Sequence, residues 1–176
     1  MNFPNILSLS RIFLSFPVII FFEYGYFIFS LLIFFIAAIS DFFDGFVARK
    51  HNQTSELGAL LDLIADKLFV SILLIWMTFI FDSKIIFISS LLIISREIII
   101  SYLRLYFITK SLEVNDVKAD FLGKFKTSIQ MIGLGLVLIS PIVSSEFFLL
   151  SLIFLLSSAV ISWVSLFKYI KKWNEK

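Results

Sequence analysis

Long apolar stretches and short polar segments alternate along the whole chain. The polar segments lie at about 23–25, 51–56, 82–84, 111–120 and 141–146, and the apolar stretches at about 7–22, 27–50, 57–81, 85–110, 121–139 and 147–172. A helix of roughly 20 apolar residues is long enough to cross the hydrocarbon core of a bilayer. The pattern therefore predicts an all-α integral membrane protein with six transmembrane helices, built as a single membrane domain over residues 1–176.

The composition narrows the class of protein and the kind of metal it can bind. Hydrophobic residues make up 60% of the 176 positions, Phe alone accounts for 23, and the mean hydropathy is +1.01. Soluble domains are nearly half apolar, so an ordinary soluble domain is excluded. Cysteine is absent and His51 is the single histidine, so any metal site must use oxygen ligands, which suits Mg²⁺ or Mn²⁺. The first apolar stretch follows no basic segment and precedes no small-residue cleavage site, so we expect it to be retained.

The basic residues gather on one side of the predicted helix bundle. That side carries Arg49, Lys50, Lys110, Lys118, Lys168, Lys171, Lys172 and Lys176, with Arg11, Lys124 and Lys126 nearby. The opposite turns carry Glu23, Asp82 and Glu146 and one basic residue, Lys84. Because cytoplasmic loops are enriched in Lys and Arg, this asymmetry predicts that both termini lie in the cytoplasm.

Four aspartates interrupt the second and third apolar stretches. Asp41 and Asp44 are three residues apart, and Asp62 and Asp66 are four apart, so each pair shares a helix face. Asp41 lies nine residues before the end of its stretch and Asp66 nine residues into the next, which places both at a depth of roughly 13 Å. An ionised carboxylate in the middle of a membrane helix costs about 2.5–3.5 kcal/mol. We therefore expect the four to share one or two divalent cations.

Other uses of intramembrane carboxylates remain open at this point. A single aspartate often pairs two helices through a hydrogen bond, and transporters carry carboxylates along ion pathways. The small residues Gly45, Ala48 and Gly58 allow either close helix packing or a pocket for a bulky ligand. Arg49, at the mouth of the same region, is placed to meet phosphate oxygens.

The spacing Asp41-x2-Asp44-Gly45-x2-Ala48-Arg49-x8-Gly58-x3-Asp62-x3-Asp66 resembles the motif of the CDP-alcohol phosphatidyltransferases at all eight defined positions. The resemblance implies a six-helix membrane enzyme, a homodimer, that joins a CDP-linked lipid to an alcohol and releases CMP. It also implies roles for the motif residues. Asp41, Asp44 and Asp62 would bind the metal ions, and Asp66 would act as general base with a share in metal binding. The CDP-lipid would contact Asn5, Gly45, Ala48, Arg49 and Gly58. No nucleic-acid partner is implied.

The acceptor alcohol has to be inferred from basic residues outside the motif. Arg96 and Arg104 lie about two turns apart on nearly one helix face, and Lys124, Lys126 and Thr127 open the fifth stretch. Together they predict a site for an acceptor that carries its own phosphate. Alternatively, Lys124 and Lys126 mark the cytoplasmic boundary of the membrane, and Arg96 pairs with a neighbouring carboxylate. Glu97 would then be the structural partner of a buried cation, and Lys67 would balance the charge of Asp66.

Segments 1–8, 95–104 and 123–127 resemble the branch of the family that uses sn-glycerol 3-phosphate as acceptor. That branch implies CDP-diacylglycerol as donor and a location in the bacterial inner membrane, with the active site facing the cytoplasm. A sister enzyme that uses another alcohol, and an ion-coupled transporter from a different class, are the alternatives.

Overall fold

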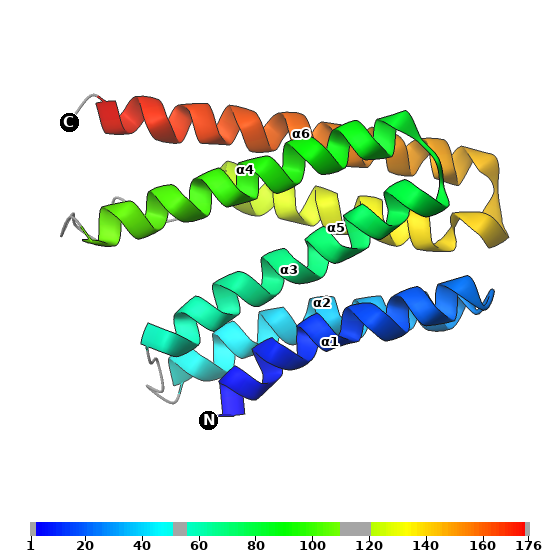
Figure 1. Cartoon of the computed structure of the whole chain (residues 1–176), viewed down its shortest axis with the longest axis horizontal. Coiled ribbons are helices and arrows are strands. Elements are labelled where there is room, and N and C mark those ends of the chain that lie inside the picture. Colours follow the sequence, from blue (N-terminus) through cyan, green and yellow to red (C-terminus); the bar gives the residue numbers. More distant parts are fainter. Residues whose placement is uncertain (1–2, 51–55, 110–120, 175–176) are drawn as a thin grey trace.

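The computed structural model describes the backbone of residues 3–50, 56–109 and 121–174, and the side chains of 10–40, 64–65, 67–103 and 125–171. Within these ranges every regular element is an α-helix, which confirms the predicted all-α class. The helices are α1 (Phe3–Glu23), α2 (Phe27–Lys50), α3 (Glu56–Ile80), α4 (Lys84–Thr109), α5 (Phe121–Val143) and α6 (Ser145–Asn174). They correspond one to one with the six predicted apolar stretches (Figure 1).

The helices form two groups of three. α1 packs against both α2 and α3, and α6 packs against both α5 and α4. Contacts of α3 with α4 and of α2 with α5 join the groups. The helices run back and forth, so that α1 begins and α6 ends at the same end of the molecule (Figure 1). The turns after α1, α3 and α5 lie at the opposite end.

Two of these turns carry recognisable capping signals. After α1, Tyr26 N–H donates to Phe21 O at 2.8 Å and Gly25 N–H to Phe22 O at 2.9 Å. This pair of bonds is a Schellman motif, and Gly25 supplies the positive φ, 80°, that the motif needs. Before α4, the Ser83 side chain accepts a bond from Ile86 N–H at 3.5 Å, as an N-cap residue does.

The turn predicted at 141–146 is wrong, because Pro141 lies inside α5 and Ser144 alone separates α5 from α6. Proline lacks the N–H that would bond to the carbonyl four residues earlier, here Val137 O. The Ser140 hydroxyl donates to this same carbonyl at 2.8 Å. The helix therefore continues past Pro141, because the Val137 carbonyl accepts a hydrogen bond from Ser140 in place of the missing backbone N–H. The first helix also begins at Phe3, earlier than the predicted position 7.

Apolar side chains fill the centre of the bundle and also cover much of its outside. The buried core includes Phe34, Phe69, Leu73, Met77 and Leu134. Many large apolar side chains are exposed, such as Phe79, Phe13 and Ile98, as expected where lipid rather than water surrounds a helix. Among the described residues, three windows are long and apolar enough to cross a membrane: Lys84–Leu103, Phe125–Val143 and Ser145–Lys171. Shorter apolar windows occupy Phe27–Ser40 and Lys67–Ile80.

Two glycines of α5 face different neighbours, which gives a matched test of packing. A Cβ at Gly133 would lie 3.1 Å from Leu155 Cδ2 and 3.2 Å from Phe154 Cβ, whereas a Cβ at Gly135 would lie 3.7 Å from Leu31 and Phe34. Both Gly→Ala changes gain the same helix propensity, about 1 kcal/mol. We expect Gly133→Ala to be less stable than Gly135→Ala by about 1–2 kcal/mol, because overpacking forces α5 and α6 apart.

Thermal unfolding of the purified variants in one detergent measures this difference, and Gly135→Ala serves as the control for helix propensity. Equal unfolding temperatures for the two variants would mean that α5 and α6 do not pack as closely as described.

Candidate active site

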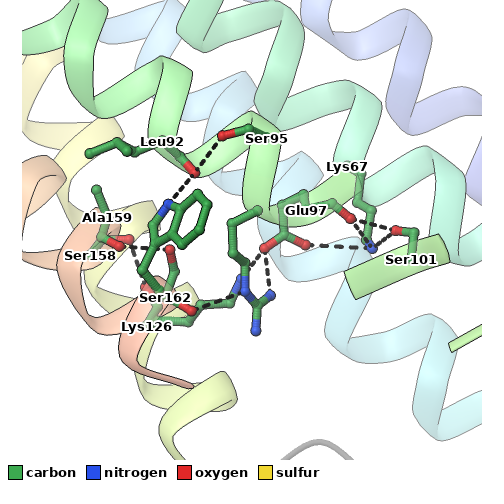
Figure 2. A network of polar contacts seen from close by, with 11 residues as sticks. Lys67, Leu92, Ser95, Glu97, Ser101, Lys126, Ser158, Ala159 and Ser162 are labelled. Atoms are coloured by element: carbon green, nitrogen blue, oxygen red, sulfur yellow. Dashed lines mark hydrogen bonds and ion pairs between the residues drawn. The ribbon is translucent and has the colours of Figure 1, made fainter. Parts of the chain in front are cut away.

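Three cationic side chains from three helices meet at one carboxylate, Glu97 (Figure 2). Arg96 of α4 donates from Nη1 to Glu97 Oε1 at 2.8 Å. The ammonium group of Lys126, on α5, donates to the same oxygen. The ammonium group of Lys67, on α3, lies 3.5 Å from the other oxygen, Oε2. These four side chains are called the charged cluster below.

Backbone carbonyls and one hydroxyl hold the cations of the charged cluster in place. Arg96 Nε donates to Ser162 O of α6 at 3.1 Å. Lys67 Nζ donates to Glu97 O at 3.3 Å and to the Ser101 hydroxyl, which itself donates to Glu97 O at 2.6 Å. The charged cluster thus ties α3, α4, α5 and α6 together. Nearby, Trp163 Nε1 donates to Leu92 O at 3.0 Å and adds a second link between α6 and α4.

The charged cluster is buried and carries an excess of positive charge. Arg96 is 5% exposed and Lys126 6%, while the side chains of Lys67 and Glu97 are 20% and 17% exposed. Arg96 and Lys126 outnumber the one carboxylate by a single positive charge, and the third cation, Lys67, has partners besides Glu97. Uncompensated charge is expensive inside a protein or a membrane. An anionic ligand would offset this excess, so the charged cluster is a candidate binding site for a phosphate group.

The two helices that carry the four aspartates, α2 and α3, are in contact two residues along α3 from Lys67 of the charged cluster. The rings of Phe34 on α2 and Phe69 on α3 stack with their centroids 6.0 Å apart. Asp41 follows Phe34 by seven residues, and Asp62 precedes Phe69 by seven. Seven residues are almost two helical turns, about 10 Å. The backbone positions of Asp41 and Asp62 therefore lie on the same helix faces as the two rings, displaced in the same direction along the bundle.

Asp66 directly precedes Lys67 in α3, so the last residue of the aspartate motif is the chain neighbour of a member of the charged cluster. The side chains of all four aspartates lie outside the described residues. The same holds for the side chains of Asn5, Ala48, Arg49, Arg104 and Lys124, and for the surroundings of Gly45 and Gly58; the backbones of all seven residues belong to the helices. Among the described side chains, no group of three or more acidic or histidine residues could hold a metal ion.

The remaining predicted site residues are described. Arg96 and Lys126 come together at Glu97, and Thr127 is exposed beside Lys126 on α5. The alternative in which Arg96 pairs with a carboxylate is confirmed. So is Glu97 as the partner of a buried cation. Lys126 is buried and lies at the start of the apolar window Phe125–Val143, so its interpretation as a boundary marker stays a prediction.

Sequence reasoning missed Ser162 and Ser101. Ser162 takes part through its backbone carbonyl, which leaves no trace in the side-chain pattern. Ser101 follows Glu97 by four residues, the spacing at which helix neighbours meet, and that spacing was the available signal.

The helices of the described residues, their apolar spans and the buried charged cluster define a class of protein: a membrane-embedded helix bundle with a candidate site for an anionic group inside it. The chain belongs to the CDP-alcohol phosphatidyltransferase family, whose model matches residues 1–167. The membership predicted from the aspartate pattern is confirmed.

The chain is similar in sequence, over nearly its whole length, to named enzymes of this family. The CDP-diacylglycerol–glycerol-3-phosphate 3-phosphatidyltransferase of Salmonella choleraesuis is 37% identical over 173 residues, covering 96% of this chain and 93% of that protein. The enzyme of the same name from Wigglesworthia glossinidia brevipalpis is 40% identical over 176 residues, with the same coverage.

Solved structures share the fold. The phosphatidylinositol phosphate synthase of Mycobacterium tuberculosis in its apo form superposes with a TM-score of 0.71 at 18% identity, covering 97% of this chain and 88% of that one. The same enzyme with CDP-DAG bound gives a TM-score of 0.69 at 19% identity, covering 97% and 85%.

Proposed function

We propose that this protein transfers the phosphatidyl group of CDP-diacylglycerol to sn-glycerol 3-phosphate, giving phosphatidylglycerol phosphate and CMP. The observation that carries the proposal is the likeness to enzymes of that name over 96% of the chain at 37–40% identity. The charged cluster supports it independently, because the positive charge of Arg96 and Lys126 in excess of Glu97 suits an acceptor that carries a phosphate.

The donor site lies between α2 and α3 in this proposal. Asp41, Asp44 and Asp62 hold one or two Mg²⁺ or Mn²⁺ ions, with Asp66 sharing in the binding. The Phe34–Phe69 contact supports this arrangement, because it brings α2 and α3 together about two turns from Asp41 and Asp62. Carboxylates are the ligands that these hard cations prefer. The bound metal would offset the negative charge of the pyrophosphate and of the departing CMP.

The small residues of the motif make room for the donor nucleotide. Gly45, Ala48 and Gly58 line a cytidine pocket, and Arg49 binds pyrophosphate oxygens as a bidentate donor. Asn5, near the start of α1, completes the donor site. The acyl chains of the donor remain in lipid, beside the exposed apolar side chains of the bundle.

The chemistry is a substitution at phosphorus. Asp66 accepts the proton of the acceptor's 1-hydroxyl, and the resulting oxygen attacks the phosphorus atom that bears diacylglycerol. The bond from this phosphorus to the bridging oxygen breaks, and that oxygen leaves with CMP. Arg96 and Lys126 hold the acceptor's own phosphate, with Arg104, Lys124 and Thr127 completing its surroundings. Lys67, which follows Asp66 and contacts Glu97, fixes the distance between the base and the acceptor phosphate.

In this proposal the enzyme is a homodimer, and all six helices of each subunit cross the bacterial inner membrane. Both termini and the active site face the cytoplasm. The return of both chain ends to one end of the bundle supports this orientation (Figure 1). So does the concentration of basic residues at that end.

An assay of CMP release tests the acceptor. Purified protein receives CDP-diacylglycerol and Mg²⁺ with glycerol 3-phosphate, inositol, inositol phosphate, serine or phosphatidylglycerol in turn. We expect glycerol 3-phosphate to give a rate at least 100-fold above inositol, serine and phosphatidylglycerol, because a site built to bind a polar group rejects ligands that leave its charges unpaired. Inositol phosphate also carries a phosphate, and we expect it to be slower because the relatives at 37–40% identity are named for glycerol 3-phosphate.

Faster CMP release with another acceptor would assign the protein to a sister enzyme of the family. Family membership already argues against the ion-coupled transporter, which would carry ions across liposomes without releasing CMP.

A further inference from the structure

Glu97 occupies a special place in the charged cluster. Among the side chains that the structure describes there, it is the one carboxylate, and each of the three cations contacts it. Arg96 and Lys126, from different helices, share a single oxygen, Oε1. Lys67 contacts both the side chain and the backbone carbonyl of Glu97. Glu97 therefore fixes where all three cations lie.

Electrostatics explains why this arrangement needs a carboxylate. Like charges crowded in a weakly polarisable interior repel strongly, and Arg96 and Lys126 are both buried. Without Glu97, these two cations would move apart toward other acceptors. With Glu97 in place, they stay together, and one positive charge of the pair remains in excess of the carboxylate.

The cations also retain donors for a ligand. The guanidinium group of Arg96 donates from Nε to Ser162 O and from Nη1 to Glu97, while Nη2 donates to none of the described residues. The ammonium group of Lys126 has three N–H groups, one of which is given to Glu97. A phosphate beside Glu97 would thus find donors already oriented from α4 and α5.

We propose that Glu97 is the positioning residue of the acceptor site: it holds Arg96 and Lys126 side by side, with their remaining N–H donors close together, so that the site selects an acceptor that carries a phosphate. This inference rests on the proposed function, and it assigns the acceptor's selection to a residue that does not itself bind the acceptor.

Two substitutions at Glu97 separate the role of its charge from the role of its shape. Glu97→Gln keeps the shape and loses the charge, whereas Glu97→Asp keeps the charge and shortens the side chain. We expect Glu97→Gln to raise the KM for glycerol 3-phosphate at least tenfold, and Glu97→Asp to raise it about threefold. The KM for CDP-diacylglycerol should change less than twofold in both, and kcat should change less than the acceptor KM.

The matched control is Glu23→Gln, at the far end of the bundle, where Glu23 accepts a bond from Trp76 Nε1 at 2.9 Å. Its acceptor KM should equal that of the unchanged protein. A purely structural role for Glu97 predicts the opposite order, with Glu97→Asp more damaging than Glu97→Gln, and that order would overturn the proposal. An unchanged or lowered acceptor KM in folded Glu97→Gln would also overturn it.

Thermal unfolding and gel filtration establish that each variant is folded. Should Glu97→Gln not fold, folded Glu97→Asp decides: a raised acceptor KM with an unchanged donor KM supports the proposal, and an unchanged acceptor KM contradicts it.

The unchanged protein separates this inference from the proposed function. If it prefers a different phosphate-bearing acceptor, the proposed function fails, and the same comparison with that acceptor still tests Glu97. If its preferred acceptor carries no phosphate, both are overturned.

Discussion

Replacing Asp66 with Asn is expected to lower the rate of CMP release by about 100- to 10,000-fold, the range that a general base contributes. Asn has nearly the same shape as Asp but cannot accept the proton of the acceptor's hydroxyl at neutral pH. The metal ligands Asp41, Asp44 and Asp62 remain, so metal-dependent binding of CDP-diacylglycerol should be largely retained. Single-turnover CMP release and direct binding of the donor lipid measure the two properties separately.

Asp82→Asn is the matched control for this change. Asp82 lies in the turn between α3 and α4 with a φ of 39°, a conformation that Asn also adopts readily. The same atoms change in both variants, but Asp82 lies beyond the end of α3 that is farther from Asp66, and Asp82→Asn should leave the rate unaltered. Turnover within threefold of normal in Asp66→Asn would remove Asp66 from the role of base.

The helices could be predicted from the sequence because their ends are marked by polar turns. The predicted boundaries of α2, residues 27 and 50, are those of the structure. The error at Pro141 has a specific physical cause. Proline usually ends a helix, yet the Ser140 hydroxyl bonds to the carbonyl that Pro141 leaves without its usual partner.

The packing of the helices was harder to predict than their positions. Helices that are apolar on every side have no polar face to indicate which side turns inward. The sequence accordingly indicated Arg96 and Lys126 as members of one site without showing that Glu97 joins them to Lys67. Lys67 and Glu97 are 30 residues apart, and Lys126 is a further 29 along the chain. Their meeting depends on how α3, α4 and α5 pack.

The four aspartates, unlike Glu97 and Lys67, could be identified as one site from their sequence spacing alone. The fold adds that the two helices carrying them are in contact. The Phe34–Phe69 stacking shows that α2 and α3 touch two turns away from Asp41 and Asp62. Aromatic residues seven positions from a polar pair, on both helices, could be used to predict such a contact in other chains.

Removal of divalent cations is expected to reduce CMP release to the background rate. Four carboxylates at matched depth repel one another, and they would cost on the order of 10 kcal/mol in lipid without cations. The donor's pyrophosphate adds further negative charge at the same place. Chelation should therefore abolish donor binding together with turnover, and added Mg²⁺ should restore both. Full activity in excess chelator would contradict the proposed metal site.

Asp41→Asn should raise the Mg²⁺ concentration that gives half the maximal rate by about 10- to 100-fold, the size of effect seen when groups that support a metal site are altered. It should also leave the acceptor KM at saturating Mg²⁺ nearly unchanged, because the acceptor's phosphate is held by the charged cluster and not by the aspartates. Asp82→Asn again supplies the control. A shift in the acceptor KM with no shift in the Mg²⁺ requirement would mean that Asp41 belongs to the acceptor site. Its assignment as a metal ligand would then be wrong.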